Sequence, residues 1–507
     1  MSEKRIRSAL ISVFYKDGLA DIVRMLHSLN IEIYSTGGTF SFINELGIPA
    51  KKVEDLTTYP SILGGRVKTL HPSVFGGILA RREMAEDLEQ LERYSIPEID
   101  LVIVDLYPFE ETLKTVTDNS EIIEKIDIGG ISLIRAAAKN YNDVLIISGR
   151  EQYTGLLEIL NSGKGHTTLD ERRHYAAKAF QTSSYYDTAI FRYFNRKEGI
   201  LAFRESIDTS YPLRYGENPH QKGIFYGDPN LIFDKLHGKE ISYNNLLDLD
   251  AALSLIDEFD STTFVIIKHN NACGVASRED AAAAWKDALA CDPVSAYGGV
   301  IVTNVPVDED TAQEIDKIFF EIIIAPAYSE SALEILKQKK NRIILRRKDS
   351  GKDEYTFRSM MKGVLWQQRD NSTESTKEMK PVTNRIPSPE EFDDLVFANI
   401  IVKHSKSNAI VIVKNRQLCA SGIGQTSRVD AMRQAIEKAG AFGFDLKGAV
   451  MASDAFFPFA DSVEIAHKAG ITAIVEPGGS VRDQDSINYC SLHDVAMVFT
   501  GIRHFKH

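Results

Sequence analysis

Cysteine is scarce in this sequence. Four occur among 507 residues, and no two stand close enough to form a CxxC pair. A disulfide framework needs a dense set of cysteines, and a structural zinc site needs clustered Cys and His ligands. The sequence therefore predicts reduced thiols, no required metal and a cytosolic protein.

Long apolar runs and an excess of basic charge are also missing. No apolar stretch approaches the roughly 18 residues that cross a bilayer. The opening residues MSEKRIR lack the apolar core and cleavage site of a signal peptide. The formal net charge is −12, which argues against a general nucleic-acid or anionic-membrane binder. A local basic pocket for a small anion is compatible with this balance.

The chain does have an ordinary globular composition, 43% hydrophobic and 26% charged, at a length that suits two to four domains. Short β-branched runs such as 9–14, 31–34 and 101–106 alternate with helical patterns such as 19–29. This alternation predicts an α/β protein with parallel or mixed sheets. Inspection by eye finds no internal repeat.

Domain boundaries are expected where these patterns weaken. A helix-rich stretch follows the first strand cluster and ends in a polar, glycine-containing segment, so the main boundary is expected near 195–205. The segment 369–380, RDNSTESTKEMK, is polar and lacks apolar periodicity, which predicts a surface loop or linker. We therefore expect a first domain at 1–148, a helical connector at 149–200, and two further regions at 201–370 and 371–507.

Glycine-rich and basic segments near the N-terminus favour an anion site. The strand pattern at 31–35 runs into TGGT at 36–39 and then a helix pattern. Glycines let backbone N–H groups approach an anion, and the threonines add hydroxyl donors. Thirty residues later, Arg66 and Lys68 share one face of an extended segment beside a second Gly-Gly pair. A plain strand-to-helix turn and a solvated basic edge are the alternative interpretations.

Two further motifs lie at predicted element ends. Tyr107 follows an apolar strand, and ligands in α/β sheets gather at the carboxyl ends of strands. Asp127 precedes a Gly-Gly helix start, while Lys139 lies near the other end of that helix, where a cation also suits the helix dipole. A straight helix over 130–139 would hold its ends about 14 Å apart. Asp127 and Lys139 could then share a small substrate only if the helix bends or begins late.

Together these segments resemble the cyclohydrolase domain of the bifunctional purine-biosynthesis enzymes that join AICAR (aminoimidazole carboxamide ribonucleotide) transformylase to IMP cyclohydrolase. STGGT, GGRVKTLHP, LYPF and IDIGG…RAAAKN match that family's signatures in its order. The resemblance implies a methylglyoxal-synthase-like α/β domain with a parallel sheet. It implies that ring closure uses Lys68, Tyr107, Asp127 and Lys139. It also implies that the ribotide phosphate and nearby groups bind to Ser12, Lys16, Thr36, Gly37, Gly38, Thr39, Arg66 and Thr69. The chain departs from the family at Phe14-Tyr15, where Ser-Asp is usual.

In the longer C-terminal part, the strongest chemical signal is a Lys-His pair. The apolar strand 264–267 runs into Lys268-His269 and an Asn-Asn turn signal. Adjacent strand residues point to opposite faces, so both side chains can reach one substrate only if the strand ends here. A positive neighbour favours the neutral imidazole, which can take a proton. A structural histidine is the alternative. The segment 422–428 lacks GxGxxG spacing, which excludes a dinucleotide fingerprint.

RYGENPHQ, KHNNACG, SAYGG, KSNAI, GQTSRVD and SDAFFPF resemble the transformylase domain of the same family, so the resemblance covers nearly all of the chain. It implies two cytidine-deaminase-like α/β subdomains without zinc, and the sequence lacks the PCxxC of a zinc deaminase. It implies that His269 takes a proton from the AICAR amine, while Lys268 stabilises the transition state or protonates the departing folate nitrogen. The residues expected to bind AICAR or folate are Arg214, Tyr215, Asn245, Gly298, Glu321, Asn408, Arg428, Asp454 and Arg503. Ala272 replaces a usual Pro, and Asn399 stands where Trp is common.

The function implied by the resemblance has two steps. A formyl group passes from 10-formyltetrahydrofolate to AICAR, giving formyl-AICAR (FAICAR) and tetrahydrofolate, and FAICAR then closes to IMP with loss of water. The resemblance also implies a homodimer and leaves a monovalent cation open. One alternative is a transformylase alone, with Phe14-Tyr15 marking a degenerate N-terminal domain. Another is a non-catalytic nucleotide-sensing module, against which Lys268-His269 argues.

Overall fold

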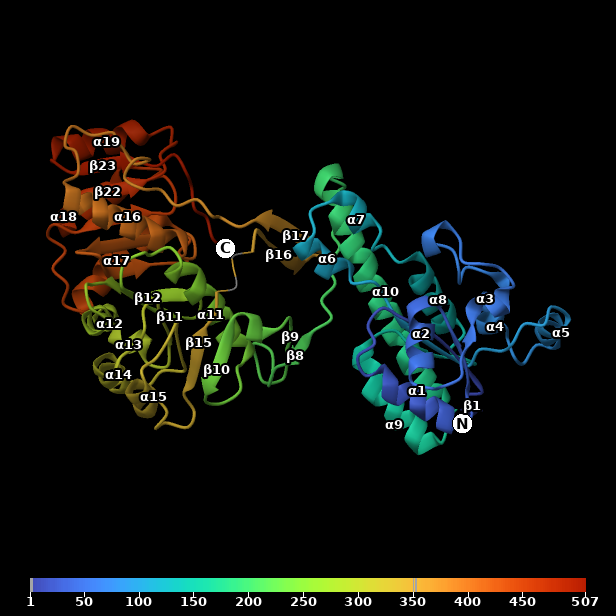
Figure 1. Cartoon of the computed structure of the whole chain (residues 1–507). Coiled ribbons are helices and arrows are strands. Elements are labelled where there is room, and N and C mark those ends of the chain that lie inside the picture. The colour runs from blue at the N-terminus through green and yellow to red at the C-terminus, as the bar shows by residue number, and fades with distance from the viewer. Residues whose placement is uncertain (1–2, 350, 352) are drawn as a thin grey trace. The chain divides into compact units, whose positions relative to one another are not determined.

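The computed structural model describes residues 3–349, 351 and 353–507. Its helices and strands alternate along the chain and form two units, which meet in sequence at Asp208 and Thr209 (Figure 1). Each unit has its own sheets and helices. The α/β class predicted from the sequence is confirmed.

Five parallel strands form the main sheet of the first unit, in the order β4-β3-β2-β5-β6. The central strands β2 and β5 are continuous buried apolar runs, as expected in a parallel sheet. Helices α1, α8, α9 and α10 contribute side chains to the same core. The strands are β2 (Ser8–Val13), β3 (Glu32–Ser35), β4 (Lys51–Lys52), β5 (Leu101–Asp105) and β6 (Leu145–Ile147). The helices are α1 (Leu19–Ser28), α2 (Gly37–Glu45), α3 (Val53–Thr57), α4 (Pro72–Leu79), α5 (Ala85–Arg93), α6 (Phe109–Thr115), α7 (Asn119–Ile123), α8 (Ile128–Lys139), α9 (Tyr153–Gly163) and α10 (Leu169–Glu198).

Helix α10 belongs to the first unit. It begins at a capping box between Thr168 and Glu171 and ends at Gly199, whose φ of 64° lies in the left-handed region that suits a helix end. Its buried face packs against α8 and β6. The stretch 149–200, expected from the sequence as a connector, is therefore folded onto the first sheet. A short pair of antiparallel strands, β1 (Lys4–Arg5) and β7 (His166–Thr167), ties the start of the chain to this region.

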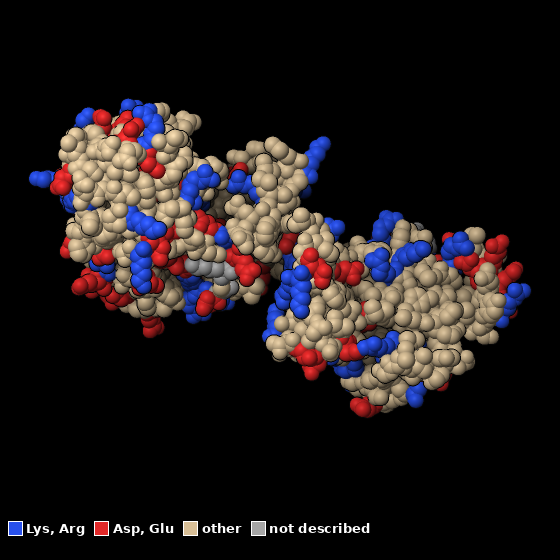
Figure 2. All heavy atoms as spheres, turned by 90° about the horizontal axis from the view of Figure 1, so that it is seen from above, with Lys and Arg blue, Asp and Glu red and all other residues tan. Residues whose placement is uncertain are grey.

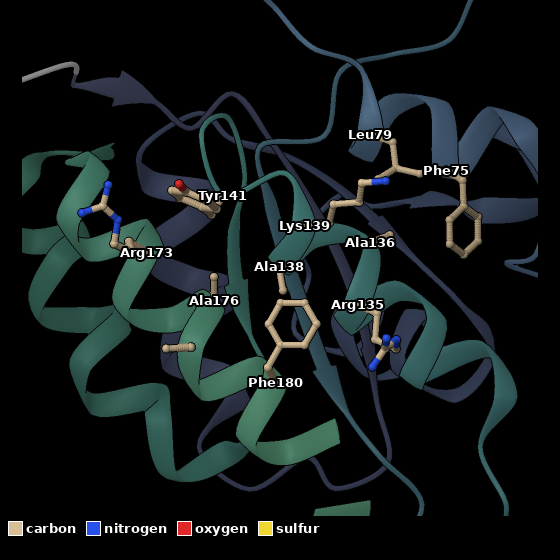
Figure 3. A pocket seen from close by; sticks show the side chains of 11 residues that line it. Phe75, Leu79, Arg135, Ala136, Ala138, Lys139, Tyr141, Arg173, Ala176 and Phe180 are labelled. Carbon is tan, nitrogen blue, oxygen red and sulfur yellow. The ribbon is translucent and has the colours of Figure 1, made fainter. Parts of the chain in front are cut away.

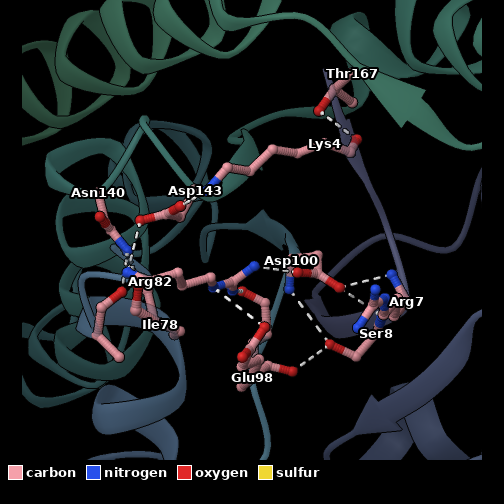
Figure 4. A network of polar contacts seen from close by, with 12 residues as sticks. Lys4, Arg7, Ser8, Ile78, Arg82, Glu98, Asp100, Asn140, Asp143 and Thr167 are labelled. Carbon is pink, nitrogen blue, oxygen red and sulfur yellow. Dashed lines mark hydrogen bonds and ion pairs between the residues drawn. The ribbon is translucent and has the colours of Figure 1, made fainter. Parts of the chain in front are cut away.

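A polar network secures the amino ends of the strands in this sheet (Figure 4). One carboxylate oxygen of Asp100 accepts hydrogen bonds from the backbone N–H groups of Arg7 (2.6 Å) and Ser8 (3.1 Å). Arg82 forms an ion pair with Asp100 and donates to the carbonyl oxygen of Ile99 at 2.8 Å. This edge is therefore occupied by structural contacts, and the glycine-rich loops lie at the opposite, carboxyl edge.

A mixed sheet of twelve strands runs through the second unit, in the order β10-β15-β14-β13-β11-β12-β20-β19-β21-β22-β23-β18. Helices α11 and α16 share a single core on one face, and two separate cores lie on the other face. The strands are β10 (Phe233–His237), β11 (Thr263–Lys268), β12 (Asn271–Ser277), β13 (Val300–Thr303), β14 (Ile322–Ala325), β15 (Ile343–Arg347), β18 (Lys380–Pro381), β19 (Ile410–Lys414), β20 (Gln417–Gly422), β21 (Val450–Ser453), β22 (Ala473–Glu476) and β23 (Ala496–Phe499). The helices are α11 (Tyr243–Ile256), α12 (Ala281–Ala290), α13 (Pro293–Ala296), α14 (Glu309–Asp316), α15 (Glu330–Leu336), α16 (Pro389–Lys403), α17 (Arg428–Ala441), α18 (Asp461–Ala469) and α19 (Asp483–Leu492).

Alternation along the strands explains these layers. On β13, Val300 and Val302 join the core beneath α11 and α16, whereas Ile301 joins the core on the other face. On β19, Val411 and Ile412 divide between the two faces in the same way. Because successive strand side chains point to opposite faces, these apolar runs are buried on both sides.

The second unit is a structural duplication that inspection of the sequence did not reveal. In each half an antiparallel hairpin adjoins three parallel strands and an antiparallel edge strand: β11/β12 with β13-β14-β15 and β10, and β19/β20 with β21-β22-β23 and β18. The halves join where β12 meets β20. Residues 242–277 align with 388–423 at a constant offset of 146. Nine of those 36 pairs are identical, at Ser242, Asp248, Leu249, Ala252, Ser261, Val265, Ile266, Lys268 and Cys273 and their counterparts.

The segment 369–380, predicted as a surface loop, is mostly exposed and has no helix or strand before β18. Glu374 and Met379 are buried exceptions. Glu374 is 2% exposed, and one of its carboxylate oxygens accepts from the Asn399 amide at 2.8 Å and lies 2.8 Å from Nε2 of His504. The other ring nitrogen of His504 lies 2.7 Å from Asp370. This polar segment therefore anchors the C-terminal tail, and Asn399 meets the buried carboxylate where the family commonly has Trp.

Two exposed hairpins complete the second unit, β8 (Ser210–Pro212) with β9 (Ile224–Tyr226) and β16 (Tyr355–Met360) with β17 (Gly363–Gln368). Acidic and basic side chains are interspersed over the face shown in Figure 2. Within 3–349, 351 and 353–507, we find no helix that is both long and apolar enough to cross a membrane.

Candidate functional sites

The TGGT motif lies where β3 meets α2, at the carboxyl edge of the first sheet. Oγ of Ser12, near the end of β2, lies 3.2 Å from Oγ1 of Thr36. Thr39 is buried and donates through its hydroxyl to the last carbonyl of β2 at 3.0 Å. Gly37 has a φ of 43°, and a Cβ built there would lie 3.9 Å from Nζ of Lys68. The structure therefore brings the β2 end, the α2 start and Lys68 together.

The other two predicted cations of this edge have protein partners. Nζ of Lys16 donates to the carbonyl oxygens of Val13 (2.6 Å) and Phe14 (2.9 Å), and burial lowers the pKa of Lys16. Arg66 is exposed and pairs with Glu124. Both lie on loops of the first unit, and each keeps N–H donors beyond those that these contacts use.

Asp127 and Tyr107 join the same group. Asp127 is the N-cap of α8, and its Oδ1 accepts from the N–H of Gly130 at 2.6 Å. Burial raises the pKa of Asp127, against the opposing effects of backbone donors and the Lys68 charge. Burial, followed by the negative charge of Asp127, raises the pKa of Tyr107. Thr69 is buried beside the first turn of α8. A cation, a half-buried acid and a phenol thus lie at one edge of the sheet.

The Phe14-Tyr15 departure builds an aromatic wall at this edge. The Phe14 ring meets the Tyr107 ring edge-on, with centroids 5.4 Å apart. Nζ of Lys125 lies 5.8 Å from the first ring and 5.9 Å from the second. The hydroxyl of Tyr15 donates to Glu111 at 2.6 Å. Phe14 therefore packs directly against Tyr107, and Tyr15 packs against Phe14 with centroids 4.9 Å apart.

Lys139 lies elsewhere. Helix α8 is unbroken from Ile128 to Lys139, and at about 1.5 Å per residue its ends are about 16 Å apart. Lys139 instead lines an open groove between α4, α8 and α10 (Figure 3). Other side chains that line it are Phe75, Arg135, Tyr141, Arg173 and Phe180. The described chain therefore does not bring Lys139 to Asp127.

In the second unit, Lys268 ends β11 and His269 begins the hairpin turn. Nζ of Lys268 donates to the carbonyl oxygens of Tyr297 (2.9 Å) and Gly298 (3.0 Å). Gly298 has a φ of 70°, and a Cβ there would lie 3.2 Å from that ammonium. An ammonium has three N–H donors, so one remains for a ligand. His269 is exposed, which leaves its imidazole accessible.

The residues that hold this turn, Asp248 and Asn271, were not predicted as functional. We call Lys268–Asn271 the histidine turn. Oδ1 of Asp248, on α11, accepts from the N–H of Asn270 at 2.7 Å. The Asn271 amide donates to the carbonyl oxygen of His269 at 2.8 Å, and its oxygen accepts from the N–H of Lys406 at 3.3 Å. An aspartate within a helix and an asparagine in a turn form no sequence motif, so only the fold reveals this support.

A second cluster lies at the carboxyl edge of the β21-β22-β23 strands, two residues after Lys406, the partner of Asn271. Nη2 of Arg428 donates to Oδ1 of Asn408 (3.0 Å) and to Oδ1 of Asp454 (2.7 Å). The C-terminal tail reaches this cluster, because the N–H of His504 donates to the Asp454 carbonyl at 3.1 Å. The neighbouring Arg503 is exposed and covers the Phe505 ring. In the described chain Nε of Arg428 and Oδ2 of Asp454 have no partner, which leaves a donor and an acceptor for a ligand.

The remaining predicted ligands are less closely grouped. Asn245 is buried and forms the capping box of α11 with Ser242. Arg214 is exposed and covers the ring of Tyr215 at 5.4 Å. Glu321 forms an ion pair with a lysine at 2.5 Å, and its N–H donates to the carbonyl oxygen of Gly299, beside the Lys268 contact.

Metal ligands were sought across everything the structure describes. No group of three or more His, Cys, Asp or Glu side chains there could hold a metal ion. The four cysteines are buried and unpaired, and burial raises the pKa of each thiol. Cys273 and Cys419 occupy matching positions in the duplication, which indicates a packing role.

Comparisons with known proteins match the chain to one family over nearly its whole length. The sequence model described as AICARFT/IMPCHase bienzyme matches residues 137–438, and that of an MGS-like domain matches residues 18–132. A protein of Bacteroides thetaiotaomicron named bifunctional purine biosynthesis protein PurH is 62% identical over 508 residues, covering 100% of both chains. Proteins of the same name from Acetivibrio thermocellus and Aquifex aeolicus are 46% and 47% identical, over 99% and 98% of this chain and 100% of each relative.

Proposed function

From the premise that this chain belongs to the family of AICARFT/IMPCHase bienzymes, we propose how its residues divide the work of two reactions. The chain is an AICAR formyltransferase and an IMP cyclohydrolase, and it uses a folate co-substrate. The finer assignment is that 10-formyltetrahydrofolate is the donor, that the second unit transfers the formyl group and that the first unit closes the ring.

Formyl transfer is assigned to the histidine turn. The AICAR amino nitrogen bonds to the formyl carbon, and His269 takes the proton that this nitrogen loses. The bond from the formyl carbon to the folate nitrogen then breaks, and that nitrogen gains a proton, which leaves FAICAR and tetrahydrofolate. Lys268 uses its remaining N–H to stabilise the formyl oxygen or to protonate the departing nitrogen. The observation that carries this assignment is an accessible imidazole beside an ammonium fixed by two carbonyl groups.

Substrate binding in the second unit is assigned to the cluster of Asn408, Arg428 and Asp454, because it offers an unpartnered donor and acceptor close to the histidine turn. A guanidinium suits the charged groups of a ribotide or a folate. The resemblance adds six further ligands to this assignment: Arg214, Tyr215, Asn245, Gly298, Glu321 and Arg503.

Ring closure is assigned to the carboxyl edge of the first sheet. The carboxamide nitrogen of FAICAR bonds to its formyl carbon, and the resulting carbinol loses water to give IMP. Lys68 stabilises the oxyanion, while Asp127 and Tyr107 move the protons. Burial helps Asp127 to hold a proton, since it raises the pKa of that carboxyl. The ribotide phosphate binds at the α2 start, where the ligands are Ser12, Lys16, Thr36, Gly37, Gly38, Thr39, Arg66 and Thr69.

A two-product assay tests this division. Purified protein receives AICAR and 10-formyltetrahydrofolate, and tetrahydrofolate and IMP are followed separately. We expect His269→Ala to stop tetrahydrofolate formation, and with it IMP formation from AICAR, while still converting added FAICAR to IMP. Asp127→Asn should form tetrahydrofolate normally and accumulate FAICAR. His493→Ala, at the residue that follows α19, is the matched histidine control. Retention of formyl transfer by His269→Ala would contradict the assignment.

The role that the resemblance implies for Lys139 is a separate proposal, because α8 keeps this lysine away from Asp127. Lys139→Ala decides it with FAICAR as substrate. A large loss of IMP formation would support a role in ring closure, and an unchanged rate would remove Lys139 from the site.

The family resemblance also supports a homodimer in the cytosol. Light scattering tests the first point, since full activity at monomer mass would contradict it, and cell fractionation tests the second. A monovalent-cation requirement is measured by replacing potassium with a bulky organic cation during formyl transfer.

A further inference from the structure

The two halves of the second unit contain the same hairpin turn. The histidine turn pairs Lys268 with Asn271, and the matching turn, Lys414–Gln417, pairs its first and last residues in the same register. In both turns the two central residues are left-handed, with φ of 52° and 64° in the first turn and 53° and 51° in the second. We call Lys414–Gln417 the counterpart turn.

The lysine contacts are duplicated as well. Nζ of Lys268 donates to two backbone carbonyls, and Nζ of Lys414 donates to the carbonyl oxygens of Asp445 (3.1 Å) and Lys447 (2.7 Å). In each half the acceptors lie just before the strand that follows in the sheet. One function of this lysine is therefore to fix the hairpin, whatever further role it has in catalysis.

An aspartate supports each turn from the helix above it. Asp248 and Asp394 are both the sixth residue after a capping serine, on α11 and α16 respectively. Asp248 accepts from the N–H of Asn270 at 2.7 Å. Asp394 accepts from the N–H groups of Asn415 (2.8 Å) and Arg416 (2.6 Å). Non-glycine residues disfavour left-handed backbone, so an acceptor for these N–H groups stabilises the turn conformation.

The turns differ in the side chain at their first central position. His269 in the histidine turn corresponds to Asn415 in the counterpart turn. An amide has no basic nitrogen that can accept a proton at neutral pH, whereas an imidazole does. The frame of lysine, aspartate and left-handed turn is thus common to both halves, and the proton acceptor is present in one.

We propose that Asp248 is a positioning residue for formyl transfer: by holding the backbone of the histidine turn, it presents the His269 imidazole to the substrate. Asp394 performs the same structural task at a turn without a proton acceptor. This inference rests on the assignment of formyl transfer to His269. It adds a residue that contacts neither substrate and acts through backbone N–H groups alone.

The duplication supplies a matched control for the test. Asp248→Ala, Asp248→Asn and Asp394→Ala are made in the full chain, and kcat and KM for AICAR are measured in formyl transfer. We expect Asp248→Ala to lower kcat by about 10- to 100-fold with little change in KM, because misplacing a catalytic group by about 1 Å has an effect of this size. Asp248→Asn keeps an acceptor oxygen and should recover most of the rate. Asp394→Ala should leave kcat unchanged.

Three results would overturn the proposal. The first is an unchanged kcat in Asp248→Ala. The second is an equal loss of kcat in Asp394→Ala, which would indicate general destabilisation of the sheet. The third is full activity of His269→Ala, because His269 would then have no part in formyl transfer and Asp248 could not act through it. If His269→Ala loses activity while Asp248→Ala keeps full activity, only the positioning role of Asp248 is refuted. If Asp248→Ala does not fold, Asp248→Leu against Asp394→Leu gives the same comparison, because leucine has nearly the shape of aspartate and no acceptor oxygen, and IMP formation from FAICAR reports an intact first unit.

Discussion

Raising the pH should loosen the C-terminal tail of the second unit, because His504 holds it by charge. This side chain is 2% exposed and lies between Asp370 and Glu374. Burial alone would lower the pKa of His504, but its two carboxylate partners raise it from 6.5 to about 9. Since a tenfold change in proton affinity is worth about 1.4 kcal/mol, the charged ring stabilises the fold by about 3 kcal/mol. The folded pKa lies above the unfolded one, so this stabilisation is complete below pH 6.5 and is lost as the pH rises through about 9.

Tryptophan fluorescence is a suitable assay, because Trp285 and Trp366 are the only tryptophans and both lie in the second unit. Urea unfolding of the wild type and of His504→Gln is compared at about pH 6 and about pH 10. The stability gap between them should shrink by about 3 kcal/mol at the higher pH. His493→Gln, whose ring stacks on Tyr489 at 4.1 Å, controls for loss of a histidine. A gap of equal size at both pH values would refute the reasoning.

Three further predictions concern stability. Arg82→Ala leaves Asp100 without its ion-pair partner in the polar network and should destabilise the first unit by about 3–5 kcal/mol; IMP formation should fail at a lower temperature, and an unchanged inactivation temperature would contradict this. Gly422→Ala places a Cβ 1.9 Å from the carbonyl oxygen of Ala431, so the melting temperature measured by fluorescence should fall. An unchanged melting temperature would mean that α17 shifts to accommodate the Cβ without loss of stability. Desolvation raises the pKa of Glu258, but its histidine and lysine partners hold it at about 2. Glu258→Gln should therefore reduce the difference between the urea midpoints measured at about pH 5 and at about pH 2. The wild-type carboxylate stabilises the fold above its unfolded pKa, and this stabilisation is lost as the pH falls and the carboxylate is neutralised.

The sequence predicted most reliably the residues that end strands. The TGGT motif and Tyr107 each follow a buried apolar run of the first sheet, and the carboxyl ends of parallel strands lie close together in space. Their grouping could therefore be expected before any coordinates were known. The start of helix α8 was also predictable, because Gly-Gly follows Asp127. The length of this helix places Lys139 at its far end.

What the sequence concealed depends on tertiary contacts. Asp248 resembles any polar residue on a helix, and only the hairpin packed beside α11 gives it a partner. Glu374 lies in a segment so polar that exposure was the natural prediction, yet Asn399 and His504 satisfy its charge in the interior. The duplication also escaped notice, because an identity of nine in 36 pairs is too low to recognise by eye and the shared features are caps, turns and burial.

The constant offset of 146 has a consequence for how this unit tolerates change. Three of every four aligned positions differ between 242–277 and 388–423, yet neither copy has gained or lost a residue relative to the other. One inserted residue in α11 would rotate Asp248 by about 100° around the helix axis, away from the turn it supports. Substitution is therefore permitted widely here, whereas insertion and deletion are not, and segment length is the property that both copies have kept.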